Sequence, residues 1–499
     1  MANVLYDRLI APHAGNTACF LSQASRADIT YADFVVMTAR MAHALVAHGV
    51  APGDRVVVQA PKCAEMVALY AATVQCGAVF LPLNTAYTRD EVAYFVGDAT
   101  PRVLVATDTT QGALTPIADG ADARLVTLNA DGSGTLTDGL ADRPAQFDTV
   151  ARGPDDLAAL LYTSGTTGRS KGAMLTQDNL LSNAVSLVDH WQITGDDTLI
   201  HALPIFHTHG LFVALNTSLL AEAKVVFMPG FDLDAIFAAL PHATTMMGVP
   251  TFYTRMLADD RLTPEAVANM RLFVSGSAPL LAETHSAFTH RTGHHILERY
   301  GMTETNMITS NPYTGERRPG TVGAPLPGVE VRVCDPETGD VLAPGQVGMI
   351  EVRGPNVFKG YWQMPGKTAA EMRADGYFLT GDLGTFSEDG YLSIVGRAKD
   401  LIITGGYNVY PKEIEDVLND VDGVAESAVF GVPDADFGEA IIAAVVPEAG
   451  HALSEDTLRD TVAGKLARFK HPRRYTLMAD LPRNTMGKVE KNRLRASHS

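Results

Sequence analysis

The chain has 499 residues, of which 46% are hydrophobic and 19% charged, and its formal net charge is −18. This composition is that of an ordinary globular protein, and the length predicts at least two domains. The acidic balance argues against nucleic-acid binding, which needs a basic face. The four cysteines include no C-x-x-C pair and the N-terminus lacks a signal-peptide pattern, so we expect a cytoplasmic protein.

The first third of the chain alternates strand-like and helix-like segments, which predicts α/β layers with mainly parallel sheets. In chain order, strand and helix alternate over residues 55–59, 62–75, 79–83, 90–98 and 103–106. Further strands are predicted at residues 244–249, 271–274 and 295–299.

A loop rich in glycine and hydroxyl side chains, LLYTSGTTGRSKG, occupies residues 160–172, with an apolar run before it and a helical pattern after Lys171. A strand, a glycine-rich turn and a helix can form a phosphate cradle, because glycines let backbone N–H groups close on an anion. The spacing is not that of the P-loop, since Gly165 and Gly168 are three apart and Gly172 follows the lysine. Taken alone, the loop is as readily a flexible surface turn.

An uncharged stretch at residues 199–221 is long enough to suggest a membrane span. It contains Pro204, three histidines and Asn216, so we predict no span and no membrane partner. His201, His207 and His209 suggest a metal site, but no Cys, Asp or Glu lies among them, so we disfavour that interpretation.

The sequence texture changes in the second half. Short β-rich runs separated by Pro/Gly turns predict an antiparallel β subdomain at about residues 322–396. A separate α+β domain is predicted after Gly396, with a helix that begins at Pro411. Its last part, residues 465–499, has 10 Lys and Arg against 2 Asp and Glu.

Four further motifs follow the glycine-rich loop in a fixed order: ERYGMTE at residues 298–304, TGD at 380–382, GRAKD at 396–400 and NTMGK at 484–488. Together with the loop, they resemble the ordered signatures of the adenylate-forming superfamily, which includes acyl-CoA synthetases, luciferases and adenylation domains. The resemblance covers nearly the whole chain. It implies a large N-terminal domain of two α/β layers plus the β subdomain, residues 1–396, and a small mobile α+β domain, residues 397–499, hinged near Lys399.

The resemblance also implies that a carboxylic acid attacks the α-phosphate of ATP, giving an acyl-adenylate and pyrophosphate. Charge builds on phosphoryl oxygens in that step, so cations and donors placed there matter most. Thr303 would contact the α-phosphate, Glu304 would bind Mg²⁺ and Lys488 would stabilise the developing charge. The positions implied to bind ATP are Thr163, Ser164, Gly165, Thr166, Thr167, Gly168, Lys171, Gly276, Ser277, Ala278, Pro279, Glu298, Arg299, Tyr300, Asp382 and Arg397.

Coenzyme A is the acyl acceptor that the resemblance implies. His207 matches a position between the acyl and thiol sites, and Gly405, Gly406 and Tyr407 would let pantetheine pass along the backbone, although a plain hairpin turn fits as well. The basic tail could meet the phosphates of coenzyme A or form a solvated surface. Acylation of Lys488 would remove its charge and stop adenylation, so we hypothesise a lysine acyltransferase or deacylase as a partner.

The choice of acid depends on the segments HALPIFHTHGLFVA, GVPTFYTR and SGSAPLLAETH, which resemble those of malonyl-CoA synthetases. Ser277, Met302 and His207 would line the acyl pocket. Arg255 would pair with a second carboxylate on the acid, because an unpaired buried guanidinium is costly; an ion pair with Asp259 on the same helix is the simpler alternative. Other acids (methylmalonate, medium-chain or aryl), loading of a carrier protein, and luciferase-like oxygenation stay open.

Overall fold

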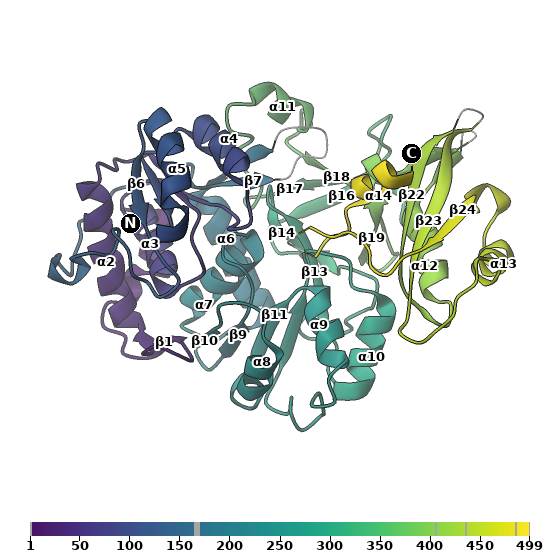
Figure 1. Cartoon of the computed structure of the whole chain (residues 1–499), viewed down its shortest axis with the longest axis horizontal. Helices are drawn as coiled ribbons and strands as arrows, with labels where there is room; N and C mark the ends of the chain where they lie inside the picture. Colours follow the sequence, from purple (N-terminus) through teal and green to yellow (C-terminus); the bar gives the residue numbers. More distant parts are fainter. Residues whose placement is uncertain (1, 164–169, 405–406, 435–436, 485–486, 499) are drawn as a thin grey trace. The chain divides into compact units, whose positions relative to one another are not determined.

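The computed structural model describes residues 2–163, 170–404, 407–434, 437–484 and 487–498 (Figure 1). Two compact units divide this chain. The first comprises residues 1–330 and 353–378, and the second comprises residues 331–352 and 379–499. The predicted β subdomain, residues 322–396, is thus divided: residues 331–352 and 379–396 group with the C-terminal residues, and the rest belong to the first unit. None of the helices in these ranges is long and apolar enough to cross a bilayer.

One sheet of the first unit has six strands in the order β6-β5-β3-β4-β7-β8. All neighbouring pairs except β7 and β8 are parallel, as the alternating pattern predicts. The strands are β3 (Arg55–Val58), β4 (Val79–Pro82), β5 (Val103–Ala106), β6 (Arg124–Thr127), β7 (Leu157–Thr163) and β8 (Lys171–Thr176).

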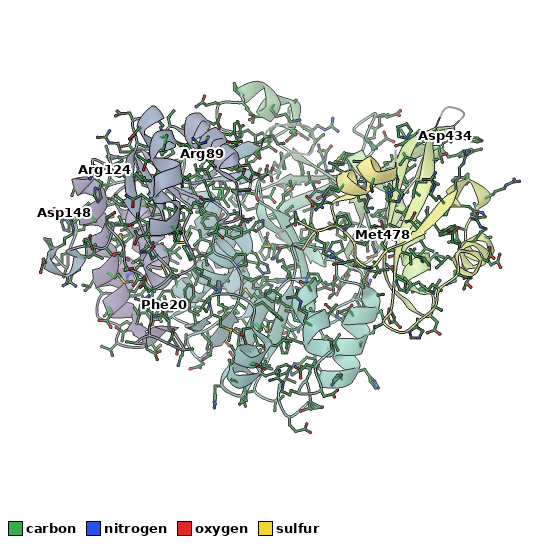
Figure 2. All side chains as sticks on the ribbon, viewed as in Figure 1. Phe20, Arg89, Arg124, Asp148, Asp434 and Met478 are labelled. Atoms are coloured by element: carbon green, nitrogen blue, oxygen red, sulfur yellow. The ribbon has the colours of Figure 1, made fainter. Side chains whose placement is uncertain are left out.

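The second sheet of this unit has nine strands in the order β15-β14-β13-β12-β11-β9-β10-β1-β2. Its central strands are parallel, and β14, β15 and β2 join antiparallel at the edges. Its strands are β1 (Cys19–Ser22), β2 (Ile29–Thr30), β9 (Thr198–His201), β10 (Lys224–Phe227), β11 (Thr245–Gly248), β12 (Leu272–Ser275), β13 (Leu297–Met302), β14 (Asn306–Ser310) and β15 (Ala324–Pro325). Phe20 on β1, labelled in Figure 2, is fully buried.

The helices of the first unit cover these sheets, and Figure 1 shows α8, α9 and α10 alongside the nine-stranded sheet. Helix α6 contacts both β8 and β14 and so joins the two sheets. Several helices begin with reciprocal capping, for example Thr88 with Glu91 at α4. The helices are α1 (Val4–Leu9), α2 (Tyr31–Ala47), α3 (Ala64–Gln75), α4 (Arg89–Ala99), α5 (Asp108–Gly120), α6 (Gln177–Trp191), α7 (Asn216–Ala221), α8 (Leu233–Ala239), α9 (Pro250–Leu257), α10 (Ala282–Thr292) and α11 (Pro365–Ala370), with a π-helix at His209–Leu215.

One predicted element is wrong. The helix expected directly after Lys171 begins only at Gln177, and residues 171–176 form β8, antiparallel to β7. The glycine-rich loop therefore connects two strands of a hairpin instead of leading into a helix N-terminus. The physical reason is that β8 pairs with β7 and also bridges Ala173 to Tyr361, and these partners are invisible to local periodicity.

The second unit contains two sheets. A four-stranded sheet has the order β16 (Glu330–Cys334), β17 (Gly348–Arg353), β18 (Phe378–Phe386), β19 (Leu392–Arg397). A five-stranded sheet is built on the long antiparallel pair β22 (Val424–Asp434) and β23 (Gly438–Pro447). Its other elements are β20 (Ile402–Thr404), β21 (Tyr407–Val409), β24 (Arg474–Leu477), α12 (Pro411–Asn419), α13 (Glu455–Lys465) and α14 (Lys491–His498).

The five-stranded sheet has apolar side chains on both faces. Val429 belongs to a cluster with Ile414 of α12, whereas Phe430, the next residue, belongs to a cluster with Leu494 of α14. Successive side chains of a strand point to opposite faces, so this alternation buries both sides of β22. The fold class predicted from the sequence is confirmed: a large N-terminal α/β part of several sheets and a small C-terminal α+β part.

Candidate active site

Lys171, at the end of the glycine-rich loop, is half-buried at the start of β8. Its Nζ lies 3.0 Å from the Tyr361 hydroxyl and 3.3 Å from Glu371 Oε1. Thr163 is its partner across the hairpin. The residues between them that were assigned to phosphate binding, Ser164, Gly165, Thr166, Thr167 and Gly168, lie outside the described residues.

Glu304 follows β13 and is 4% exposed. Its Oε1 lies 3.1 Å from the Tyr361 hydroxyl, so Lys171 and Glu304, 133 positions apart, share one tyrosine. Burial raises the pKa of Glu304, although its backbone hydrogen bond and Lys171 act in the opposite direction. A buried carboxylate of this kind fits a divalent cation that takes its remaining oxygens from phosphates.

We expect Glu304→Gln to make the first unit more stable at pH 8. Because the pKa of Glu304 is raised in the folded protein, the carboxyl loses its proton more readily in the unfolded chain. The free energy of unfolding therefore falls as the pH rises from the unfolded-state pKa to the folded-state pKa. Glutamine keeps the acceptor for Tyr361 and removes this loss. The midpoint of thermal unfolding, measured from pH 4 to 8, tests this prediction. We expect Glu304→Gln to raise the midpoint by a few degrees at pH 8 and by less at acid pH. Glu283 is exposed, and Glu283→Gln is expected to leave the midpoint unchanged. A lower midpoint at pH 8 contradicts the prediction.

Arg299 is the least expected residue of this region. Its side chain is buried, and its Nε and Nη2 have no hydrogen-bond partner among the described residues. Burial lowers the pKa of the guanidinium to about 9, which leaves it cationic at neutral pH. Gly276 packs so closely against the guanidinium that a Cβ at this position would overlap the Arg299 Cζ. A buried cation with open donors is a candidate site for an anion.

His209 and Ser277 lie close to Arg299, since the charge of Arg299 acts on His209 and Ser277 follows Gly276. His209 Nδ1 lies 3.3 Å from Ser277 Oγ, while its Nε2 is buried without a partner in the described chain. Burial, and secondarily the charge of Arg299, holds the pKa of His209 well below its usual range. Ser277 has a φ of 71°, a strained conformation for a non-glycine residue that is frequent at functional sites. These groups converge as a small polar pocket would require.

The other site residues predicted in the first unit differ in burial. Tyr300 and Glu298 are buried, Met302, Thr303, Ala278 and His207 are half-buried, and Pro279 is exposed. His201 has both ring nitrogens engaged, by Lys62 and by the Gly210 carbonyl, each at 2.8 Å, which leaves neither for a metal. The described residues contain no cluster of three or more His, Cys, Asp or Glu suited to a metal ion.

Arg255 lies on the exposed side of α9, and its Cζ is 5.4 Å from the centre of the Phe231 ring. This differs from the buried guanidinium that the sequence argument assumed. Helix α9 turns Phe252, Tyr253 and Met256 inward, so the helical spacing leaves position 255 outside. The alternative pair with Asp259 is also absent from the described contacts, because Arg261 takes that carboxylate at 2.7 Å. A role for Arg255 in binding the acid stays a prediction.

In the second unit, Asp382 and Arg397 are cross-strand partners on β18 and β19. Asp382 is buried, and its Oδ1 lies 3.1 Å from Arg397 Nε. Together they offer two acceptors and several donors, which suits a pair of sugar hydroxyls. Lys399 follows in a short 3₁₀ helix, Ala398–Asp400; burial lowers its pKa, while Asp400 acts in the opposite direction.

Lys488 is half-buried in a turn held by its own backbone: the Asn484 N–H donates to the Lys488 carbonyl at 2.9 Å, and the Lys488 N–H donates to Asn484 Oδ1 at 3.0 Å. Gly405 and Gly406 lie outside the described residues. Tyr407 is exposed and stacks on Phe469 at 4.6 Å, beside the basic tail. Most basic residues of that tail have acidic partners; Lys470, for example, pairs with Glu413, and Arg473 pairs with Asp434, which Figure 2 labels.

Tyr361 and Glu371 both contact Lys171, and neither was predicted from the sequence as a site residue. Neither residue belongs to a motif with recognisable chemistry. Tyr361 is 190 positions and Glu371 is 200 positions from the lysine along the chain. The sequence also assigned Arg299 only to nucleotide binding. A charged side chain next to Ile296 and Leu297, in a segment predicted as a strand, was the signal that could have singled it out.

A family model described as AMP-binding enzyme matches residues 8–362, and one described as AMP-binding enzyme C-terminal domain matches residues 413–488. A malonate–CoA ligase of Arabidopsis thaliana is 36% identical over 480 residues, covering 89% of this chain and 78% of that protein. An indoleacetate–CoA ligase of Aromatoleum aromaticum is also 36% identical, covering 94% and 93%.

A solved structure is more similar. ATP-bound MatB from Rhodopseudomonas palustris is 55% identical, with a TM-score of 0.98 and 99% of each chain covered. The two ligases above have the same identity to this chain and act on different acids, so overall identity by itself does not choose the acid.

Proposed function

The chain belongs to the family of AMP-binding enzymes, and from this premise we propose that it is an AMP-forming malonate–CoA ligase. In the first half-reaction, a carboxylate oxygen of malonate attacks the α-phosphorus of ATP and pyrophosphate leaves. In the second, the thiolate of coenzyme A attacks the acyl carbonyl and AMP leaves. The products are malonyl-CoA, AMP and pyrophosphate.

The observation that carries the choice of a dicarboxylic acid is the buried guanidinium of Arg299, with Nε and Nη2 unpaired in the described chain. Leaving a buried cation without an anion is strongly unfavourable. The distal carboxylate of malonate supplies that anion and can accept two parallel hydrogen bonds from a guanidinium. Ser277 and His209 lie beside it and provide further polar contacts. Arg255 stays a second candidate for the same carboxylate.

The remaining residues have roles in the phosphoryl step. Lys171 would bind the outer phosphates, Tyr300 would pack on adenine and Thr303 would contact the α-phosphate. Mg²⁺, held by Glu304 and by phosphate oxygens, would supply charge neutralisation when bound. Asp382 and Arg397 would hold the ribose hydroxyls, and their pairing on adjacent strands supports this assignment. Lys488 would stabilise charge at the α-phosphate.

The thioester step would use a different set of residues. His207 would separate the acyl and thiol sites, and the strand after Gly406 would guide pantetheine past Tyr407. The exposed pair of Tyr407 and Phe469 adds a stacking surface beside Lys470, which supports a coenzyme A site in this part of the second unit. We propose that Lys399 is the hinge between the two half-reactions.

Pyrophosphate release across a panel of acids tests the proposed function. We expect malonate to give the highest kcat/KM, methylmalonate to be partly accepted because it adds one methyl group, and acetate to fall by a factor of about 10⁴ because it leaves a buried charge unpaired. Succinate is longer and misplaces its reacting carboxylate. Each acid is assayed with and without coenzyme A. Equal or better use of octanoate would exclude the dicarboxylate assignment and favour a medium-chain acid.

A further inference from the structure

The lysine assigned to ATP phosphates already has an anionic partner within the protein. Lys171 Nζ lies 3.3 Å from Glu371 Oε1 and 3.0 Å from the Tyr361 hydroxyl, and 4.1 Å from the centre of the Tyr361 ring. Its side chain is 19% exposed and that of Glu371 22%. The pair is therefore only partly solvated, and water screens it less than an ion pair on an open surface.

Glu371 follows α11, the short helix labelled in Figure 1. It accepts from three donors: Lys171, the Tyr361 hydroxyl at 2.6 Å and Lys367 at 2.8 Å. Burial raises its pKa, but the contacts with Lys367, Tyr361 and Lys171 outweigh burial, and the net pKa is lower than usual. At neutral pH, Glu371 is thus an ionised counter-ion.

Tyr361 links this counter-ion to the cation-binding carboxylate. Its hydroxyl lies 2.6 Å from Glu371 Oε2 and 3.1 Å from Glu304 Oε1. A phenol has one proton to donate, and the shorter distance shows that Glu371 is the better acceptor. Glu304 is left with the weaker contact in a buried position. Moving Glu371 away would free the proton of Tyr361 for a hydrogen bond to Glu304.

We propose that Glu371 is the resident counter-ion of Lys171 in the nucleotide-free enzyme, and that the outer phosphates of ATP bind by taking its place. The inference depends on the proposed function, because Lys171 is taken as the phosphate ligand. Glu371 is a positioning residue: it acts through Lys171 and does not touch the reacting atoms. It competes with the phosphates for one cation and repels them, so it weakens ATP binding while keeping a half-buried lysine paired.

Direct binding of Mg-ATP and of AMP, without acid or coenzyme A, tests this exchange. Glu371→Gln keeps the hydrogen bond to Tyr361 and removes the charge. We expect its Kd for Mg-ATP to fall by about two- to fivefold, the range of a partly exposed ion pair. AMP lacks the outer phosphates, so its Kd is expected to stay unchanged. If Glu371 had only a structural role, the variant would change the Kd values for Mg-ATP and AMP together or would change neither.

Matched variants complete the experiment. Lys367→Gln changes the other cation on Glu371 and is expected not to tighten ATP binding. In a double-mutant cycle, Glu371→Gln is expected to tighten ATP binding less once Lys171 is replaced by glutamine, because only the direct repulsion of the phosphates is then left to relieve. Glu371→Asp keeps the charge, and its Kd for Mg-ATP is expected to return part of the way to the wild-type value. If Glu371→Gln does not fold, Glu371→Ala is compared with Glu371→Asp instead.

An unchanged or raised Kd for ATP in Glu371→Gln, or equal tightening of AMP, overturns the inference. Its failure is distinguishable from failure of the proposed function. If ATP binding responds as expected but no acid releases pyrophosphate, the proposed function is wrong and the exchange stands. If malonate is activated and ATP binding does not respond, only the exchange is wrong.

Discussion

Lys488→Ala is expected to lower the rate of adenylate formation by a factor of about 10²–10³, the usual loss when one group that stabilises transition-state charge is removed. Thioester formation from supplied malonyl-adenylate is expected to change little, because that step breaks the acyl C–O bond and neither forms nor breaks a bond to phosphorus. Pyrophosphate exchange measures the first half-reaction, and release of AMP from the supplied adenylate measures the second.

The basic tail provides a matched control for this variant. Arg493 carries the same sign of charge on α14, is largely exposed and pairs with Glu490 at 3.1 Å. Arg493→Ala is expected to leave both half-reactions near wild type. If Lys488→Ala slows both half-reactions equally, the Lys488 side chain serves both steps or the fold, and its assignment to the phosphoryl step is wrong.

Arg299→Met is expected to lower kcat/KM for malonate by about 10⁴ and to abolish the preference over acetate, since the site loses the buried cation proposed to pair with the distal carboxylate. Methionine is similar in length and apolar, and replacing a buried cation that has unpaired nitrogens is expected to leave thermal stability unchanged or higher. The measurement is kcat/KM for malonate, methylmalonate, succinate, acetate and octanoate, together with a thermal unfolding curve.

Arg255→Ala is the matched variant, because both arginines have been assigned to the same carboxylate. Its guanidinium lies on the exposed side of α9, so we expect a smaller loss with malonate than for Arg299→Met. Retained malonate preference in Arg299→Met together with its loss in Arg255→Ala would reverse the assignment. Retained preference in both variants would show that neither arginine recognises the acid.

Local sequence pattern predicted much of the fold. The alternation of strands and helices at residues 55–106 is observed as β3, α3, β4, α4 and β5, with ends displaced by two residues at most. The helix with Pro411 in its first turn is observed as α12. These segments were predictable because burial of one face imposes a period on residues that are neighbours in the chain. The motifs likewise identified Glu304, Asp382 and Arg397 as functional candidates.

Contacts between distant residues were decided by tertiary structure alone. Residues 171–176 follow a helical pattern into α6, yet they form β8 because β7 and Tyr361 lie beside them. Arg255 lies in the segment that the sequence predicted for the acyl pocket, but its side chain is exposed. The guanidinium of Arg299 is instead buried against Gly276. Lys171 and Glu371 are 200 positions apart, and their ion pair depends on where β8 and α11 pack. Periodicity and motif order describe neighbours in the chain, and a side chain's partners in space depend on packing that no local pattern encodes.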